Sequence, residues 1–246
     1  PSDNSLRGKR IPFASDPPQI DISLDYGISY HHDEIDLINP DFSGLRWYGP
    51  QVKSGSTQII TTPTPNGKSE VDCYIELKMR GYSLSGSSST FHSIELHANS
   101  INDNKIGSTS SWTGNGLRTI SGSILGTDLN STGNNFFISN LSSDNNSSPL
   151  IDFLTVKYGR KLVFTGKQLD FFSPVENTSL RFNFHDELSE NITIFDISDS
   201  KSPKRISIRE QLIIEVETPV NKPGRYIVFN QNDIDSISSF VKSEQT

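Results

Sequence analysis

The sequence has 246 residues and a formal charge of −7 at neutral pH, with 22 Lys or Arg against 29 Asp or Glu. Binding to a nucleic-acid backbone requires a clustered basic surface. The densest basic stretch, residues 201–209, is interrupted by Ser and Pro, which is typical of a solvated loop. The apolar runs, such as Leu212-Ile213-Ile214, are far shorter than the about 20 residues of a membrane-spanning helix. Charge and composition therefore exclude a nucleic-acid partner and a helical membrane span.

The chain begins at Pro1 and shows no basic-then-apolar export signal, so we expect any such signal to lie outside this sequence. Cys73 is the single cysteine, which excludes a disulfide within the chain. Its surroundings, Val-Asp-Cys-Tyr-Ile at 71–75, are typical of a strand, and a buried structural thiol is the favoured interpretation. A nucleophilic pair with His92 or His97 stays a second interpretation, although the sequence shows neither an oriented base nor an oxyanion hole.

Strand signals dominate the chain from residue 58 onward. Runs rich in Val, Ile, Phe, Tyr and Thr recur every ~10–15 residues between clusters of Gly, Asn, Ser, Asp and Pro. Within residues 74–80, Ile75, Leu77 and Met79 alternate with charged residues, the period of a half-buried antiparallel strand. The predicted strands cover residues 58–62, 70–83, 89–98, 105–109, 117–124, 135–141, 149–164, 168–173, 179–185, 192–197, 205–208, 212–218 and 224–229.

The pattern of elements predicts an all-β fold. No stretch of a dozen residues carries a convincing 3.6-residue apolar stripe, and the best helical candidate is residues 233–241. Many short strands without intervening helices predict an antiparallel β-sandwich or jelly roll, in one or two sub-domains. From composition we expect an N-terminal arm over 1–43, a jelly-roll-like sandwich over 44–165, a second β sub-domain or continuation over 166–232, and a C-terminal linker over 233–246.

Two aromatic turns supply the candidate contacts for a ligand or partner. Trp112 precedes Asn115 in a turn-rich loop, and Trp47 opens the turn Trp-Tyr-Gly-Pro. An aromatic side chain on such a loop can stack on a sugar ring. It can also anchor a core ahead of a tight turn, which is the favoured interpretation. The exposure of Trp112 separates the two, because a sugar site needs the indole exposed and a scaffold buries it.

The most metal-like cluster is His31-His32-Asp33-Glu34. Adjacent side chains of an extended chain point to opposite faces, so His31 and His32 cannot readily bind one ion. An exposed polar turn is favoured there, and also at His185-Asp186-Glu187. We therefore predict no catalytic residue, no cofactor site and no metal site in this chain.

Several motifs, taken in order, resemble a known family. Residues 44–49, Gly-Leu-Arg-Trp-Tyr-Gly, are similar to G-x-R-W-[YF]-G. Residues 151–162 resemble L-D-[WF]-[IL]-x-[VL]-x-Y-x-R-K-L, and residues 164–171 resemble F-x-G-x-Q-L-x-F. Residues 194–203 and 224–229 resemble [IV]-W-D-[IV]-T-D-P-x-x-P and R-x-Y-[IV]-[AV]-F. Together they look like the N-terminal β region that precedes the catalytic domain of gingipain-type cysteine peptidases, in the type IX secretion sortase family of Bacteroidetes-type bacteria.

The resemblance implies a non-catalytic, extracytoplasmic segment of a cell-surface or outer-membrane-associated peptidase. Such enzymes remove the C-terminal sorting domain of secreted cargo and attach the cargo to surface lipopolysaccharide, with catalytic His and Cys residues in the following domain. The implied partners are that peptidase domain, attachment-complex proteins and cargo, with strand addition at a sandwich edge as one mode of contact. The alternatives are a carbohydrate-binding β-sandwich that uses Trp112, and an adhesin-like spacer.

Overall fold

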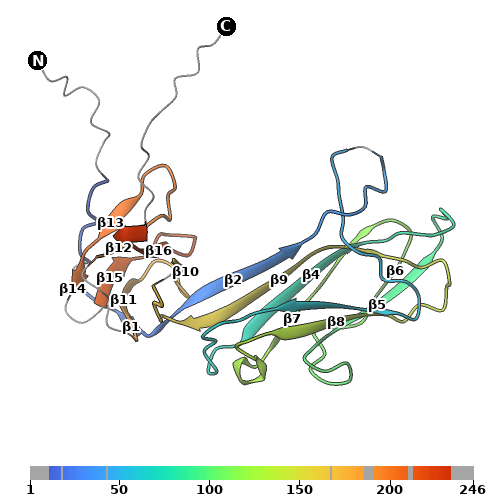
Figure 1. Cartoon of the computed structure of the whole chain (residues 1–246), viewed down its shortest axis with the longest axis horizontal. Helices are drawn as coiled ribbons and strands as arrows, with labels where there is room; N and C mark the ends of the chain where they lie inside the picture. Colours follow the sequence, from blue (N-terminus) through green and yellow to red (C-terminus); the bar gives the residue numbers. More distant parts are fainter. Residues whose placement is uncertain are drawn as a thin grey trace, which may run out of the picture. The chain divides into compact units, whose positions relative to one another are not determined.

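The computed structural model describes residues 11–17, 19–42, 44–166, 168–185, 191–209 and 213–233, which are almost entirely strands and loops (Figure 1). The predicted all-β fold is confirmed, because helical structure in these ranges is confined to single 3₁₀ turns such as Gly126–Asp128. No helix of the described residues is long and apolar enough to cross a membrane. The helix expected over residues 233–241 lies, apart from residue 233, outside the described part of the chain.

The chain divides into two compact units. The first, which we call the jelly-roll unit, is Ile28–Lys161, and the second, the terminal unit, combines Pro1–Gly27 with Leu162–Thr246. This division differs from the boundaries expected from composition, because residues 22–34 form strands of the sheets and not an arm. The Pro- and Asp-rich composition of residues 1–40 predicts an arm, but the short segment around Ile28 is buried as part of a strand.

Eight strands build the jelly-roll unit. One sheet has the order β2-β9-β4-β7 and the other has the order β3-β8-β5-β6. This is the strand order of a jelly roll, in which eight strands wind into two Greek keys. The strands are β2 (Tyr26–Glu34), β3 (Thr57–Thr62), β4 (Cys73–Arg80), β5 (Phe91–Ala98), β6 (Ser110–Thr113), β7 (Leu117–Ile124), β8 (Asn134–Asn140) and β9 (Leu150–Lys161).

The inward rows of these two sheets form the core of the jelly-roll unit. In β4, Ile75, Leu77 and Met79 are at most 1% exposed, whereas the side chains between them are more exposed, as their alternation predicts. Ile94 and Leu96 of β5 belong to the same apolar cluster. Burying a large apolar side chain contributes about 1.5–3 kcal/mol to folding, so these rows hold the sheets together.

The terminal unit has its own core. Four of its strands form a sheet of order β1-β11-β15-β14, in which β1 pairs with β11 in parallel, and the other four lie side by side in the order β13-β12-β16-β10. Aromatic rings fill the centre, with Phe171 5.2 Å from Phe182 and 5.3 Å from Tyr226 between ring centroids. The strands are β1 (Ile22–Leu24), β10 (Leu169–Phe172), β11 (Ser179–Asn183), β12 (Ile192–Asp196), β13 (Lys204–Ile206), β14 (Ile208–Arg209), β15 (Ile213–Glu217) and β16 (Arg225–Asn230).

The buried hydroxyl of Tyr226 generates a prediction about stability. Its ring is fully buried, and its oxygen has no hydrogen-bond partner among the described residues. A buried polar group without a partner costs about 1–3 kcal/mol, so Tyr226→Phe is expected to raise the free energy of unfolding by about 1 kcal/mol. Tyr158→Phe is the matched control, because that hydroxyl donates to the Pro65 carbonyl and its loss should destabilise. Urea denaturation measures both, and a Tyr226→Phe protein less stable than the wild type would contradict the prediction.

Candidate functional site

Trp112 is a core residue. It lies on β6 with 4% of its surface exposed, and its ring centroid is 5.0 Å from that of His92. Its indole edge packs on the backbone of Gly81, where an added Cβ would lie 2.7 Å from the indole nitrogen. Neither face of the ring is open to a ligand, so the sugar-binding alternative lacks the exposed indole that it requires.

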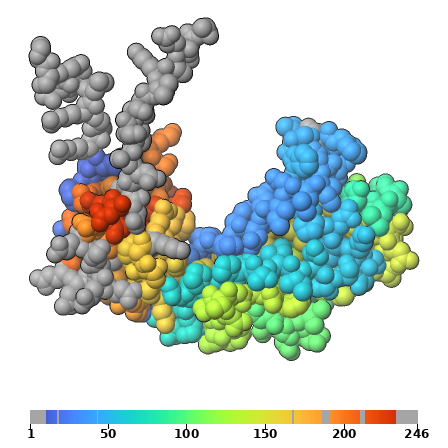
Figure 2. Space-filling model, in the orientation of Figure 1, coloured from blue at the N-terminus to red at the C-terminus, as the bar shows by residue number. Residues whose placement is uncertain are grey.

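The other two predicted contacts are exposed but lie apart. Trp47 is 45% exposed, and its indole nitrogen donates to the Gly44 carbonyl at 3.3 Å. The segment between β2 and β3 that carries Trp47 stands out from the surface, coloured blue in Figure 2. Trp47 lines a hollow with Lys78 and Asp152, whereas Asn115 lines a different one beside Arg80. The structure therefore does not bring Trp47, Trp112 and Asn115 together into one site.

The histidine-rich segment lies at the end of β2, which is a strand and not the expected turn. Its side chains form two separate pairs, since His31 contacts Asp33 at 3.2 Å and His32 contacts Glu34 at 3.2 Å. The His32 ring also stacks near Phe153, with centroids 4.9 Å apart. Among the described residues, no three His, Cys, Asp or Glu side chains gather in the manner of a metal site.

Cys73 faces the core of the jelly-roll unit. It is fully buried on β4 within the apolar cluster, and burial raises the pKa of its thiol to about 12. His97, by contrast, lies on the outward row of β5 in the other sheet and bonds to the Asp103 carbonyl and Glu95. A thiol with this pKa is almost entirely protonated at neutral pH, and only a thiolate is a strong nucleophile. The geometry thus opposes a Cys73–His97 pair, and the protonated thiol opposes a nucleophilic role with either histidine.

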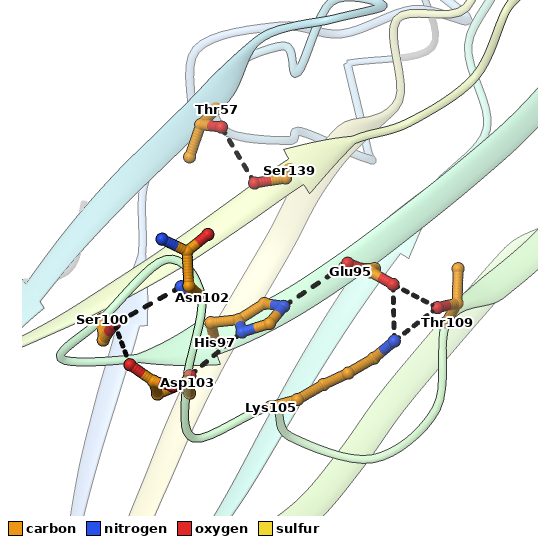
Figure 3. Close-up of polar contacts among 9 residues, drawn as sticks. All are labelled: Thr57, Glu95, His97, Ser100, Asn102, Asp103, Lys105, Thr109 and Ser139. Atoms are coloured by element: carbon orange, nitrogen blue, oxygen red, sulfur yellow. Dashed lines mark hydrogen bonds and ion pairs between the residues drawn. The ribbon is translucent and has the colours of Figure 1, made fainter.

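A trough lined by polar side chains and by Ile101 and Leu141 lies on the outer face of the β3-β8-β5-β6 sheet, and its polar contacts are drawn in Figure 3. Its volume is about 410 Å³, and its floor is formed by outward-facing side chains of β3, β5 and β8. His97 and Ser139 are only 7% and 9% exposed although they face outward. The residues that define this outer trough are Thr57, Glu95, His97, Asn102 and Ser139.

Hydrogen bonds fix the groups on the trough floor. The Glu95 carboxylate accepts from the Lys105 ammonium and from the Thr109 hydroxyl, the latter at 2.6 Å. These two bonds and the contact with His97 hold the pKa of Glu95 at about 2, well below its usual 4.5. The His97 Nδ1 atom lies 3.0 Å from the Asp103 carbonyl oxygen, to which it can only donate. The network therefore ties residues 99–109 to β5, and Glu95 stays ionised at neutral pH.

Comparison with known proteins gives a strong likeness to a solved structure. No family model matches the chain, and no curated protein matches it. The crystal structure of dimeric latent PorU from Porphyromonas gingivalis is similar at a TM-score of 0.73 and 16% identity, over 91% of this chain and 22% of that one. A family 35 carbohydrate-binding module from Clostridium thermocellum gives a TM-score of 0.31 and 14% identity, over 52% of this chain and 90% of that one. A TM-score of that size carries no weight for fold or function.

The fold class is therefore an all-β chain of two sandwich-like units, one of them a jelly roll. The fold is that of part of PorU, and this chain spans about a fifth of the length of that protein, 22% of its chain.

The Glu95 network predicts a pH-dependent contribution to stability. The pKa of Glu95 is lower in the folded protein than its usual 4.5. The ionised carboxylate therefore stabilises the folded protein above about pH 4.5, and this stabilisation is lost as the pH falls to about 2. Glu95→Gln is expected to lower the free energy of unfolding at pH 7 by up to about 1 kcal/mol, the range of partly exposed ion pairs. Denaturant titrations should show that the difference in unfolding free energy between Glu95→Gln and the wild type disappears between pH 7 and pH 2. Glu76→Gln on β4 is the control, and an equal loss of stability in that variant would contradict the prediction.

The buried thiol predicts slow alkylation. In the native protein, Cys73 should react with iodoacetamide at pH 8 at least about a hundredfold more slowly than in urea, because the thiolate is both scarce and covered. Mass spectrometry of timed samples measures the two rates. Comparable rates in the folded and unfolded states would show that the thiol is accessible.

Proposed function

We propose that this chain is a non-catalytic β region of a type IX secretion sortase-like cysteine peptidase, where it supports the catalytic domain and its contacts with partners or cargo. The proposal places the chain outside the cytoplasm, at the cell surface or the outer membrane. Its partners would be the peptidase domain of the same protein, attachment-complex proteins and cargo.

The observation that carries the proposal is the likeness to PorU over 91% of this chain at a TM-score of 0.73. A likeness that spans both compact units is more specific than a shared jelly roll, because jelly rolls host many unrelated functions. The motifs at residues 44–49, 151–162 and 224–229 add support that is independent of the coordinates.

The polar groups of the chain favour a supporting role. Arg80 binds Asp41 through two bonds of 2.5 and 2.6 Å, which fastens the segment between β2 and β3 to β4. Lys105 makes a single ion pair with Glu95, which fastens the loop after β5 to that strand. Charged pairs of this kind hold surface loops in place against the strands. They are not arranged as a nucleophile and its base.

The test compares this chain alone with the longer native protein that contains it. We expect the isolated chain to fold but to leave a cargo protein with a C-terminal sorting domain intact over hours. The longer protein should cleave that cargo, and removal of this region from it should lower cleavage at least about tenfold, because supporting contacts position the catalytic groups. Gel analysis of cargo cleavage gives all three results.

Cys73→Ala provides the control for the isolated chain and for the longer protein. Because the thiol is a core group, the substitution should leave cleavage by the longer protein unchanged. Hydrolysis by the isolated chain that disappears with Cys73→Ala would refute the non-catalytic assignment. Full cleavage by the longer protein without this region would refute the supporting role.

A further inference from the structure

We propose that the outer trough binds a neutral, hydroxyl-rich ligand of the size of a disaccharide. The trough has a volume of about 410 Å³, and small-ligand sites span about 300–1,000 Å³. It lies on the outer face of the β3-β8-β5-β6 sheet, whereas Trp112 points from β6 of the same sheet into the core. The proposed site is therefore separate from the aromatic loop that the sequence suggested, and it does not need an exposed indole.

A row of three directly opposed polar residues crosses the floor of the trough. Thr57 of β3 is opposite Ser139 of β8, and Ser139 is in turn opposite Glu95 of β5. Neighbouring strands lie about 4.8 Å apart, so the row is about 10 Å long. The row can therefore contact several polar groups of one extended ligand.

The hydroxyl pair at one end of the row can both donate and accept further hydrogen bonds. The Thr57 and Ser139 hydroxyls share one bond of 2.9 Å. Each hydroxyl has one hydrogen and two lone pairs, so the shared bond leaves about one hydrogen and three lone pairs for a ligand. A sugar hydroxyl has the same dual character, so it can donate to this pair and accept from it.

Glu95 and Asn102 add further groups beside the hydroxyl pair. The Glu95 carboxylate has several lone-pair positions, which are not exhausted by its bonds to Lys105, Thr109 and His97. The Asn102 carboxamide, which offers both N–H donors and a C=O acceptor, is directed toward the hydroxyl pair in Figure 3. Donors and acceptors are thus interspersed along the trough, as the recognition of several neighbouring hydroxyls requires.

The charges around the trough favour a neutral ligand. Glu95 is ionised at neutral pH, so it repels an anion, and none of the described residues that line the trough is Lys or Arg. The negative charge of Glu95 is offset by the ammonium of Lys105, which donates to it. The carboxylate therefore has little net attraction left for a cationic ligand.

Two aliphatic side chains give the trough an apolar part. Ile101 and Leu141 line it and are 47% and 54% exposed. A sugar ring carries C–H groups that can cover such side chains while its hydroxyls bond to the floor. Removing this apolar surface from water favours binding, and a ligand without an apolar face would leave it exposed. The combination of hydroxyl groups and an apolar face distinguishes a sugar from other small polar molecules.

The experiment uses saturation-transfer difference NMR on the purified chain at neutral pH. The neutral probes are cellobiose, maltose, lactose and mannobiose, and the charged probes are glucosamine and glucuronate. We expect transfer to at least one neutral disaccharide and weaker transfer to both charged sugars. In amide chemical-shift titrations, the bound disaccharide should shift Glu95 and Ser139 on the outer sheet and leave Gly122 on β7 unchanged.

Variants of the hydroxyl pair test the assignment. The double variant Thr57→Val with Ser139→Ala removes both hydroxyls, so the dissociation constant of the disaccharide should rise at least about tenfold. Thr61→Val is the matched control, because Thr61 lies on the same strand and bonds to Asn135 at 2.7 Å outside the trough. Leu141→Ser removes part of the apolar surface and should raise the dissociation constant about threefold. Because Leu141 is largely exposed, that variant keeps the test valid if the double variant does not fold.

Three results would each overturn the proposal. The first is the absence of transfer to all four neutral disaccharides, and the second is stronger transfer to glucosamine or glucuronate. The third is an affinity that is unchanged by loss of the trough side chains, or that falls equally with Thr61→Val. Transfer to the uncharged peptide acetyl-Gly-Ser-Gly-amide in place of the sugars would assign the trough to a peptide, and this result would contradict the proposal as well.

Discussion

Apolar contact between the inward rows of β4 and β5 joins the two sheets of the jelly-roll unit, and the position of the outward-facing side chains depends on it. Ile75 and Leu77 on one side and Ile94 and Leu96 on the other are fully buried in a single cluster. Because strand side chains alternate, burying these rows forces Glu95 and His97 onto the outer face. The outer trough is thus a consequence of how the core is packed.

Much of the fold could be predicted because the alternation of apolar and polar residues along a strand is a local feature of the sequence. The alternation of residues 74–80 correctly predicts which side chains of β4 face the core. The strand expected at 105–109 lies instead at Ser110–Thr113, because Lys105 and Thr109 bind Glu95 in a loop. β1 was missed, since its partner β11 lies more than 150 residues along the chain and leaves no local signal.

The site was harder to predict than the fold, because its members meet only through pairing. Thr57 and Ser139 share a hydrogen bond of 2.9 Å across 82 residues of sequence. Trp112 and Trp47 both precede turns, but one points inward from a strand and the other outward from a loop. Turn composition cannot distinguish these cases, whereas the position of Trp112 opposite His92 in the β5–β6 register does.

The division of the chain also constrains how it is made. The jelly-roll unit is continuous in sequence, whereas the terminal unit needs residues from both ends of the chain. During synthesis or export, the jelly-roll unit can fold as soon as Lys161 emerges, since domains fold as units in the order in which they appear. β1 must wait for β11, its parallel partner. β1 is therefore secured later than the strands of the jelly-roll unit that follow it in the chain, and it is exposed to proteases and holding chaperones throughout that interval.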